Sequence, residues 1–383
     1  HPSDREKFEM DLYHAVTCTQ GYDAVMRVRT SANLAIQNYL GNFRSISPTD
    51  IEMGVVDSDQ TLVAHLKYVG KFNDGGRVVV QSATLYTTAA GHRRIRVHTL
   101  ALDASASLSS VFRNADLDAI VNVHSRTAAA QIVQQGALAQ VRQSLIDRCI
   151  AILAVYRKHC SQRSASGQLV LPDALKHLPI YTLGLMKSPI LSMSPNFGVD
   201  FKMHIRQLVN HVPLQTLSLL LYPRLFDALD VPSDFDSSCV TSDGIVTQLP
   251  PLMRVQYENL KPDSIHIMDC GIAVYLWVGG HVPEDILRAL FNVTHLEGTQ
   301  GRALQLNPNE DHPISRRIHS FIRTLRYQCH TSNTVYVVAP SDPTSLPYRV
   351  FVDYFTEDRT KVSLSYVDFL CQVHRQIQQK LGE

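Results

Sequence analysis

GHRRIRVHTL, residues 91–100, is the stretch that decides the fold class of the first part of this 383-residue chain. Residues of two kinds alternate along it, Ile95, Val97 and Thr99 against Arg94, Arg96 and His98. A period of two residues is typical of a β-strand with one buried face. We therefore expect one face of this strand to pack and the other to be cationic. Residues 75–102 contain no Asp or Glu, so any acidic partner of these arginines must come from elsewhere.

Further strands are predicted on the N-terminal side of this stretch. Segments typical of strands cover residues 22–30, 33–39, 61–69, 77–87 and 93–101. A region of about a hundred residues built in this way most simply forms an antiparallel β-sandwich. Arg27 and Arg29 of AVMRVRT lie on one face of their strand, so we expect them to join the arginines of 91–100 in one basic surface. That surface either attracts acidic partners or is an ordinary solvated face.

The sequence becomes typical of helices after these strands. From Ser107 to Cys160 it has one glycine and no proline, which favours a helical bundle. SIHIMDCGIAVYLWVGG at 264–280 predicts two strands around an Asp-Cys-Gly turn, and TVYVVAP at 334–340 predicts a buried strand. An amphipathic helix over 363–381 closes the chain, with a predicted cap at Ser365. The fold class is therefore multidomain α+β.

Composition excludes several classes of protein. Lys and Arg number 36 against 35 for Asp and Glu, so the chain is not a globally basic nucleic-acid binder and we expect no nucleic-acid partner. Seven cysteines without a CxxC pair favour reduced thiols of a cytosolic protein over a disulfide framework or a zinc site. No apolar run approaches the roughly 20 residues that span a bilayer.

A search for catalytic chemistry finds no motif. GxxxxGK[ST], GxGxxG, GxSxG and HExxH are all absent from the sequence. The histidines do not group with cysteines or carboxylates at the spacing of metal ligands. No nucleophile, base and orienting group can be named together, so the sequence predicts neither a catalytic nor a metal site and favours a protein that is not an enzyme.

Seven segments of this chain carry a family resemblance. They are, in order from about Phe8 to Leu381, YDAVMRVRTSANLAI, YLGNF, SATLYTTAAGHRRIRVHTLAL, LPDALKHLPIYTLGLMKSPIL, YPRLF, MDCGIAVYLWVGG and SYVDFLCQVHRQI. In this succession they resemble the cargo-adaptor subunit of the COPII inner coat, the Sec twenty-four family. The resemblance implies an antiparallel β-sandwich, an all-helical domain and a gelsolin-like α/β domain.

Domain borders follow from the resemblance together with the periodicity. We expect a short leading helix at 1–21, the β-sandwich at 22–104, the helical domain at 105–222, the gelsolin-like domain at 223–358 and a C-terminal helix at 359–383 that returns to the helical domain. The zinc ribbon, the trunk domain and the Pro-rich tail of the family have no counterpart in the sequence. We therefore expect no cofactor in this chain, since the zinc ion of the family belongs to the ribbon.

The resemblance also implies a function in transport from the endoplasmic reticulum to the Golgi. Such subunits are coat adaptors that bind sorting signals in the cytosolic tails of cargo and fusion proteins. The matching positions of the signal pocket are Arg27, Leu85 and, more weakly, Arg29. A guanidinium can hold a signal carboxylate through two hydrogen bonds, and Leu85 would form the floor of an apolar subsite. The alternative for Leu85 is ordinary packing within the sheet.

Partners and location are implied in the same way. The family binds a partner inner-coat subunit of the Sec twenty-three type through the trunk, contacts the small GTPase and the outer coat indirectly, and faces an anionic membrane surface. We expect a cytoplasmic protein that is peripheral at endoplasmic reticulum exit sites and on COPII vesicles.

Two other functions stay open at this point. The paralogous GTPase-activating subunit of the Sec twenty-three type shares the order of domains, although the ending SYVDFLCQVHRQI favours the adaptor. A gelsolin-type protein that binds actin and phosphoinositides would need several gelsolin-like repeats, and the WVGG pattern occurs once.

Overall fold

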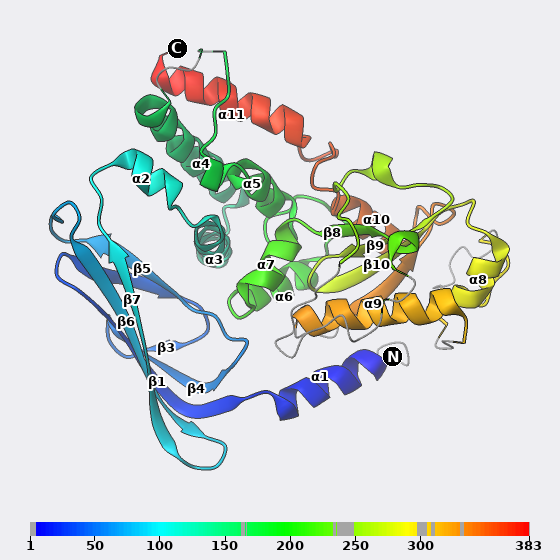
Figure 1. Ribbon diagram of the computed structural model, residues 1–383, viewed down its shortest axis with the longest axis horizontal. Helices are drawn as coiled ribbons and strands as arrows, with labels where there is room; N and C mark the ends of the chain where they lie inside the picture. The colour runs from blue at the N-terminus through cyan, green and yellow to red at the C-terminus, as the bar shows by residue number, and fades with distance from the viewer. Residues whose placement is uncertain are drawn as a thin grey trace. The chain divides into compact units, whose positions relative to one another are not determined.

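Figure 1 shows the computed structural model of the chain, in which the protein divides into two compact units. The structure describes residues 5–161, 165, 167–232, 235, 249–296, 305–307, 311–329 and 333–382. The first unit comprises His1–Val16, Leu183–Lys202 and Gln215–Phe369, and the second comprises Thr17–Thr182, Met203–Leu214 and Leu370–Glu383. Each unit therefore draws on segments that are far apart in the sequence.

The second unit begins with the predicted β-sandwich. Its strands are β1 Gln20–Thr30, β2 Leu34–Leu40, β3 Arg44–Ser45, β4 Asp50–Asp57, β5 Val63–Tyr68, β6 Arg77–Thr88 and β7 Arg93–Asp103. One layer is a five-stranded sheet in the order β3-β4-β1-β6-β7, and β2 with β5 forms the other. All pairs are antiparallel. Val28, Ile51 and Met53 are buried on the inner face of the large sheet, so this face supplies the core.

Strand β7 differs from its prediction, because all 11 of its residues are exposed. Ile95 and Val97 are 67% and 52% exposed. The strand lies at the edge of a five-stranded sheet whose second layer has only two strands, and neither of its faces is buried. The alternation of residue types along a strand shows that its two faces differ in chemistry. Whether either face is buried depends on what the second layer covers. The expectation of one packed face was therefore wrong.

The strand register also corrects the predicted basic surface. Val97 pairs with Ala83, which pairs with Arg27, so the apolar side of β7 continues the face that carries Arg27. Arg96 pairs with Thr84, which pairs with Met26, and therefore lies on the opposite face together with Arg94. Directly opposed residues of antiparallel strands share a face. The arginines of β1 and the pair Arg94 and Arg96 thus lie on opposite faces of one sheet.

Strands β3 and β4 were not predicted. The segment of β4, DIEMGVVD, begins and ends with Asp and contains Gly54, and these residue types are depleted in strands. Pairing with β1 nevertheless runs from Gln20 opposite Asp57 to Arg27 opposite Asp50. The tertiary partner strand thus overrides a weak local preference.

The helical part follows the sandwich, as predicted. Its helices are α2 Leu108–Arg113, α3 Leu117–Gln135, α4 Leu138–Cys160, the 3-10 turn η2 Asp173–Leu175, α5 Leu178–Lys187, α6 Val199–Val209 and α7 Leu214–Leu221. Asp116 caps α3 by accepting a hydrogen bond from the amide of Ala119 at 3.0 Å. Gly136, with φ +67°, ends α3 in the left-handed conformation that glycine favours.

The first unit contains a four-stranded sheet in the order β11-β10-β9-β8. Its elements are α1 Arg5–Thr17, β8 Arg224–Asp227, η3 Ala228–Asp230, η5 Tyr257–Asn259, β9 Ile265–Asp269, β10 Ala273–Val278, α8 Glu284–Phe291, α9 Pro313–Cys329, β11 Thr334–Val338 and α10 Leu346–Asp353. Ile318 and Phe321 of α9 pack with one face of the sheet, and Phe351 of α10 packs with the other. Trp277 of the WVGG segment is 3% exposed in the second of these cores and therefore has a structural role.

Helix α11, Tyr366–Leu381, closes the chain as predicted. Ser365 caps it by accepting a hydrogen bond from the amide of Asp368 at 3.1 Å. Phe369, Val373 and Ile377 are buried along one stripe, which is the spacing of an amphipathic helix. No helix within the described ranges has the length and apolar character needed to cross a bilayer.

Candidate functional site

Arg27 is held by Asp50 on the outer face of the large sheet. Its Nε donates to Oδ1 of Asp50 at 2.5 Å and its Nη2 donates to Oδ2 at 2.6 Å. These hydrogen bonds, together with one from Ser47, lower the pKa of the Asp50 carboxyl, while burial opposes them. Asp50 lies opposite Arg27 in the register of β1 and β4. No pattern in the sequence pointed to this partner, because it lies 23 residues away in a strand that was not predicted.

The structure brings Leu85 and Arg27 onto the same face. Arg27 lies opposite Ala83 of β6, and Leu85 is two residues further along that strand, opposite Val25. Such diagonal neighbours lie within reach of one another's long side chains. The β-bulge of β1 falls between Tyr22 and Val25 and therefore leaves the register at Arg27 regular.

Arg29 extends the same face by one further row. It lies opposite Gln81, whose Nε2 donates to Oγ1 of Thr99 at 3.1 Å. Its positive charge helps to lower the pKa of the Asp50 carboxyl, as a smaller contribution than the hydrogen bonds from Arg27. It is thus the less engaged of the two predicted guanidinium groups.

Three rows of residues cross the outer face. Val25, Leu85 and Ile95 form an apolar row, Arg27, Ala83 and Val97 form the next, and Arg29, Gln81 and Thr99 form the polar third. An apolar strip therefore lies beside two guanidinium groups. This arrangement suits a ligand that carries an apolar group next to a carboxylate.

A further arginine closes one end of this face. Arg93 donates from Nη1 to the Asp23 carboxylate at 2.8 Å, to its backbone carbonyl at 3.0 Å and to Oγ1 of Thr87 at 2.8 Å. Asp23 has a positive φ of 50° at the bulge of β1. Arg93 therefore stabilises the bulge, and its guanidinium is already bound to Asp23.

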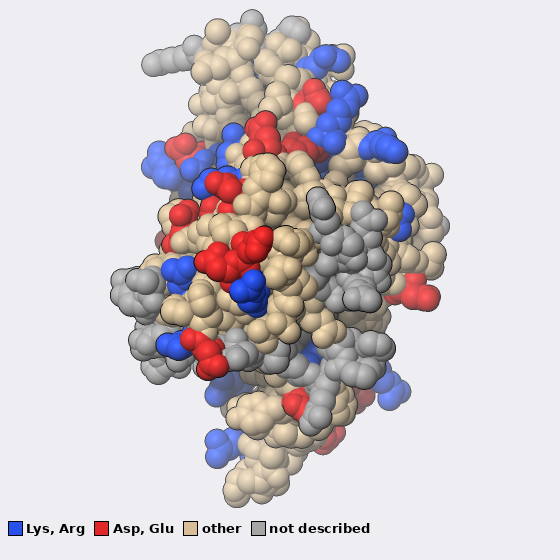
Figure 2. All heavy atoms as spheres, turned by 90° about the vertical axis from the view of Figure 1, so that its right-hand side faces the viewer, with Lys and Arg blue, Asp and Glu red and all other residues tan. Residues whose placement is uncertain are grey.

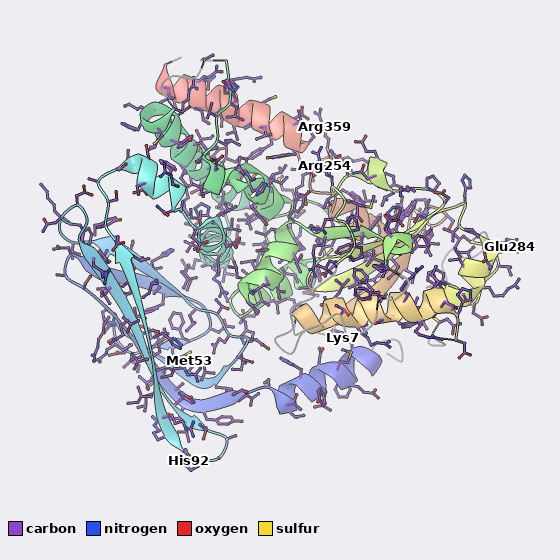
Figure 3. The ribbon with its side chains drawn as sticks, in the orientation of Figure 1. Lys7, Met53, His92, Arg254, Glu284 and Arg359 are labelled. Carbon is purple, nitrogen blue, oxygen red and sulfur yellow. The ribbon has the colours of Figure 1, made fainter. Side chains whose placement is uncertain are left out.

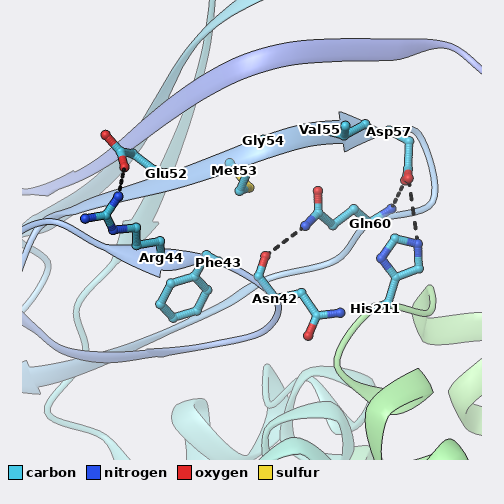
Figure 4. A pocket seen from close by; sticks show the side chains of 10 residues that line it. All are labelled: Asn42, Phe43, Arg44, Glu52, Met53, Gly54, Val55, Asp57, Gln60 and His211. Atoms are coloured by element: carbon cyan, nitrogen blue, oxygen red, sulfur yellow. Dashed lines mark hydrogen bonds and ion pairs between the residues drawn. The ribbon is translucent and has the colours of Figure 1, made fainter.

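A second feature of the unit is a cavity of about 380 Å³ beside β4 (Figure 4). It is lined by Asn42, Phe43, Arg44, Glu52, Met53, Gly54, Val55, Asp57, Gln60 and His211. Arg44 Nη1 lies 3.8 Å from Glu52 Oε2 at one end, and His211 Nε2 lies 3.8 Å from Asp57 Oδ2 at the other. The cavity thus has apolar residues between an ion pair at one end and a His–Asp contact at the other.

In the first unit, a cluster of polar residues surrounds the buried Glu357. Tyr222 donates to Oε1 of Glu357 at 2.7 Å, and Arg254, labelled in Figure 3, donates to Oε2. Lys187 donates to the carbonyl of Thr356 at 2.8 Å, and burial lowers the pKa of its ammonium to about 8. All three donors hold the short segment that precedes α11, so the cluster has a structural explanation.

Charge is mixed on the face of the molecule shown in Figure 2. Lys and Arg side chains there lie next to Asp and Glu side chains, without a field of one sign. Among the residues that the structure describes, no group of three or more His, Cys, Asp or Glu is placed to hold a metal ion. The outer face of β1, β6 and β7 and the cavity beside β4 are therefore the features that suit ligand binding.

Comparison with known proteins assigns the domains. Residues 21–105 match the Sec23/Sec24 beta-sandwich domain, residues 116–219 match the Sec23/Sec24 helical domain, and residues 246–322 match the gelsolin repeat. The chain is 33% identical over 382 residues to the human protein transport protein Sec24C, and 36% identical over 385 residues to Sec24 B of Arabidopsis thaliana. Each alignment covers 99% of this chain. The chain is thus similar to Sec24 proteins along its length and contains two Sec23/Sec24 domains.

A solved structure shows the same similarity over almost the whole of this chain. The crystal structure of the human COPII-coat protein Sec24c matches with a TM-score of 0.89 at 32% identity, covering 99% of this chain and 48% of that one. The family resemblance and the fold class predicted from the sequence are thus confirmed. This chain spans 33% of the length of either curated relative, and the domain borders expected from the sequence stay a prediction.

Proposed function

We propose that this chain is a cargo-selecting adaptor of the COPII coat, acting in transport from the endoplasmic reticulum to the Golgi. The observation that carries the proposal is the outer face of the sandwich, where Arg27 and Arg29 lie beside the apolar row that contains Leu85. The names of the relatives, protein transport proteins and a COPII-coat protein, point to the same process. The function is binding, with no catalytic role assigned to any residue.

The ligand we infer is an acidic or hydrophobic-acidic sorting signal in the cytosolic tail of a membrane protein. A carboxylate of the signal would replace Asp50 on Arg27 or bind Arg29, and an apolar side chain would lie on Leu85. Charge-assisted hydrogen bonds of this type are among the stronger ones in proteins. Asp50 is bound to Arg27 in the free protein. It therefore competes with the carboxylate of the signal and lowers the affinity of the protein for that signal.

The partners and location follow from the same proposal. The chain acts at the cytoplasmic side of exit sites, together with a Sec23-type partner subunit, the small GTPase and the outer coat, next to an anionic membrane surface. Neither alternative function gains support. The two curated relatives named above are Sec24 proteins, and a gelsolin repeat matches one segment of the chain.

The test is the binding of hydrophobic-acidic tail peptides to the chain, measured by titration calorimetry across a salt series. Arg27→Ala is expected to weaken binding more than about tenfold, because a charge-assisted hydrogen-bond pair contributes on the order of 1.5–3 kcal/mol. Leu85→Trp is expected to block the apolar subsite. Asp50→Asn is expected to strengthen binding, because it removes the competing carboxylate from Arg27.

Arg77→Ala is the matched control, since Arg77 lies at the far end of β6 with its exposed Asp103 partner 3.7 Å away. If Arg27→Ala and Leu85→Trp bind the peptides as the wild type does while remaining folded, the outer face is not the signal site. If Arg77→Ala loses as much peptide affinity as Arg27→Ala, the peptides are attracted by the general positive charge of the surface and do not bind in a specific pocket.

A further inference from the structure

The turn between β3 and β4 contains a serine that is followed by proline. The sequence has three such Ser-Pro pairs, which begin at Ser47, Ser188 and Ser194. Ser188 and Ser194 are each 3% exposed, whereas Ser47 is half-buried and lies between the exposed residues Ile46 and Pro48. Proline-directed protein kinases modify a serine in this sequence context, and they need it at the surface. Of the three serines, Ser47 is therefore the one that such a kinase can reach in the folded chain.

The Ser47 hydroxyl contacts the carboxylate that holds Arg27. Its Oγ donates to Oδ2 of Asp50 at 3.1 Å, and Nη2 of Arg27 donates to the same oxygen at 2.6 Å. The hydroxyl and the guanidinium thus share one acceptor atom. Because the oxygens of a phosphate extend beyond the hydroxyl that carries it, a phosphate on Ser47 would lie within reach of the Arg27 guanidinium.

The backbone around Ser47 also suits an added anion. Ser47 Oγ accepts from the amide of Thr49 at 3.2 Å and from the amide of Asp50 at 3.0 Å. Backbone amides and arginine are donors that hold phosphate groups in proteins. A serine phosphate carries a charge of about −1.5 to −2 at neutral pH, more than a carboxylate does. It is therefore the stronger partner for Arg27 and would displace Asp50.

We propose that Ser47 is a phosphorylation site for a proline-directed kinase, and that its phosphate closes the signal site by binding Arg27. This inference rests on the proposed function, in which Arg27 binds a carboxylate of the sorting signal. In the transfer, Ser47 Oγ bonds to the γ-phosphorus of ATP, and the bond from that phosphorus to the β–γ bridging oxygen breaks. ADP leaves with the electron pair, and the hydroxyl proton passes to the catalytic base of the kinase.

Phosphorylation would change the charge that an acidic signal meets. In the unmodified chain, the carboxylate of Asp50 faces Arg27 and, as a smaller contribution, the charge of Arg29. With a phosphate on Ser47, the negative charge of the phosphate and of Asp50 together outweighs these two guanidinium groups. A signal carboxylate would then lose its partner and be repelled, so the modified chain would release acidic signals.

The first measurement is the modification itself. The folded chain is incubated with a proline-directed kinase and ATP, and mass spectrometry locates the phosphate. We expect phosphate on Ser47 and none on the buried Ser188 and Ser194. Pro48→Ala is expected to lose most of the modification, because it keeps the hydroxyl and removes the recognised proline.

The second measurement detects the contact with Arg27 and uses no peptide. Phosphoserine is incorporated at position 47 during synthesis of the chain, and phosphorus NMR follows the second pKa of its phosphate. This pKa is expected to be lower in the presence of Arg27 than in Arg27→Ala, because a nearby positive charge favours the ionised form. The matched control is phosphoserine at Ser58, which is exposed beyond the other end of β4 and also donates to a carboxylate, that of Asp59. Its phosphate pKa is expected to be the same with and without Arg27.

The third measurement is the affinity for hydrophobic-acidic tail peptides, determined by titration calorimetry. Phosphoserine at position 47 is expected to weaken binding more than about tenfold, because Arg27 is no longer open to the signal. Phosphoserine at position 58 is expected to weaken it less than about twofold, since it adds the same charge at a distance. Circular dichroism establishes that both modified chains are folded.

Three outcomes overturn the inference. The kinase leaves Ser47 of the folded chain unmodified, the phosphate pKa is unchanged in Arg27→Ala, or the chain with phosphoserine at 47 binds the peptides as well as the unmodified chain does. Failure of the proposed function differs from all three, because then no peptide binds the unmodified chain while the kinase and NMR results are as expected. In that case the phosphate contacts Arg27 without controlling a signal, and the regulatory role is overturned as well.

Discussion

Arg126 is a buried cation without a carboxylate partner among its hydrogen bonds to described residues. Its guanidinium donates to Oδ1 of Asn122 at 2.7 Å and to two backbone carbonyls. Burial lowers its pKa to about 10, so the group stays charged near neutral pH. Burying a charge is costly unless its donors are satisfied. Here the satisfied donors join the β4–β5 connection to the turn after α6.

Arg126→Met is expected to lower the free energy of unfolding by about 2–4 kcal/mol, because the carbonyls of Thr61 and Val212 lose a buried donor. Urea denaturation followed by circular dichroism measures the loss. Arg113→Met, at an exposed position of α2, serves as the control and is expected to change stability by less than about 0.5 kcal/mol. A similar cost for both variants would contradict the role assigned to Arg126.

His124 gives the second unit a pH dependence. Burial, followed by the charges of Arg148 and His65, lowers its pKa from 6.5 to about 4. Between these two values the unfolded chain binds a proton that the folded chain does not. The contribution of neutral His124 to the free energy of unfolding is therefore fully present above pH 6.5. It is lost as the pH drops toward 4, by about 3 kcal/mol at most. His124→Phe is expected to flatten this part of the stability curve measured by denaturation between pH 4 and 7, and an unchanged slope would assign it to other groups.

At the scale of elements, β4 and β7 show that the place of a strand in the sheet outweighs its composition. β4 has poor strand residues, lies between β3 and β1 and buries Ile51 completely. β7 has better strand residues and the clearer alternation, lies at the edge and is exposed throughout. The apolar pattern of β7 therefore contributes to surface chemistry, whereas that of β4 contributes to the core.

Two isoleucines of the same sheet test this contrast. Ile51→Ala is expected to cost about 2–5 kcal/mol of unfolding free energy, because it leaves a cavity in the core. Ile95→Ala is expected to cost about 0.5 kcal/mol or less, since the side chain is 67% exposed. Chemical denaturation of both variants gives the comparison. An equal cost would mean that β7 is covered in solution.

At the scale of the whole molecule, the chain crosses between its two compact units several times. The final residues from Leu370 onward belong with the second unit, although the segment immediately before them belongs with the first. Val373 and Ile377 of α11 are buried. Ile377 and His374 border a small cavity together with Arg157 of α4. The C-terminal part of α11 therefore packs with the helices of the second unit.

Removing residues 370–383 is expected to destabilise the second unit selectively, because the loss of the Val373 and Ile377 side chains leaves a large apolar cavity in its core. Hydrogen exchange measured by mass spectrometry should show faster exchange in α4, with little change in β9 and β10. Uniformly faster exchange in both units would contradict the division into two cores.

More of the fold than of the candidate site could be predicted from the sequence. Helix α11 and the strands β9 and β10 were predictable, because local periodicity and a turn glycine define them. Arg27, Leu85 and Arg29 were predicted to share a surface, and the register places them on one face. The contacts of Asp50 and Arg126 were not predictable, because each depends on chain segments that are distant in sequence.

The sequence by itself determined the order of the elements, the amphipathic stripe of α11 and the family resemblance, since these depend on residue type and spacing along the chain. The tertiary structure alone decided that both faces of β7 are exposed, that Arg27 is held by Asp50, and that β3 pairs with β4 only as far as Glu52. The physical reason is that register and layer coverage arise between strands. The energy of a side chain depends on which neighbours those strands supply.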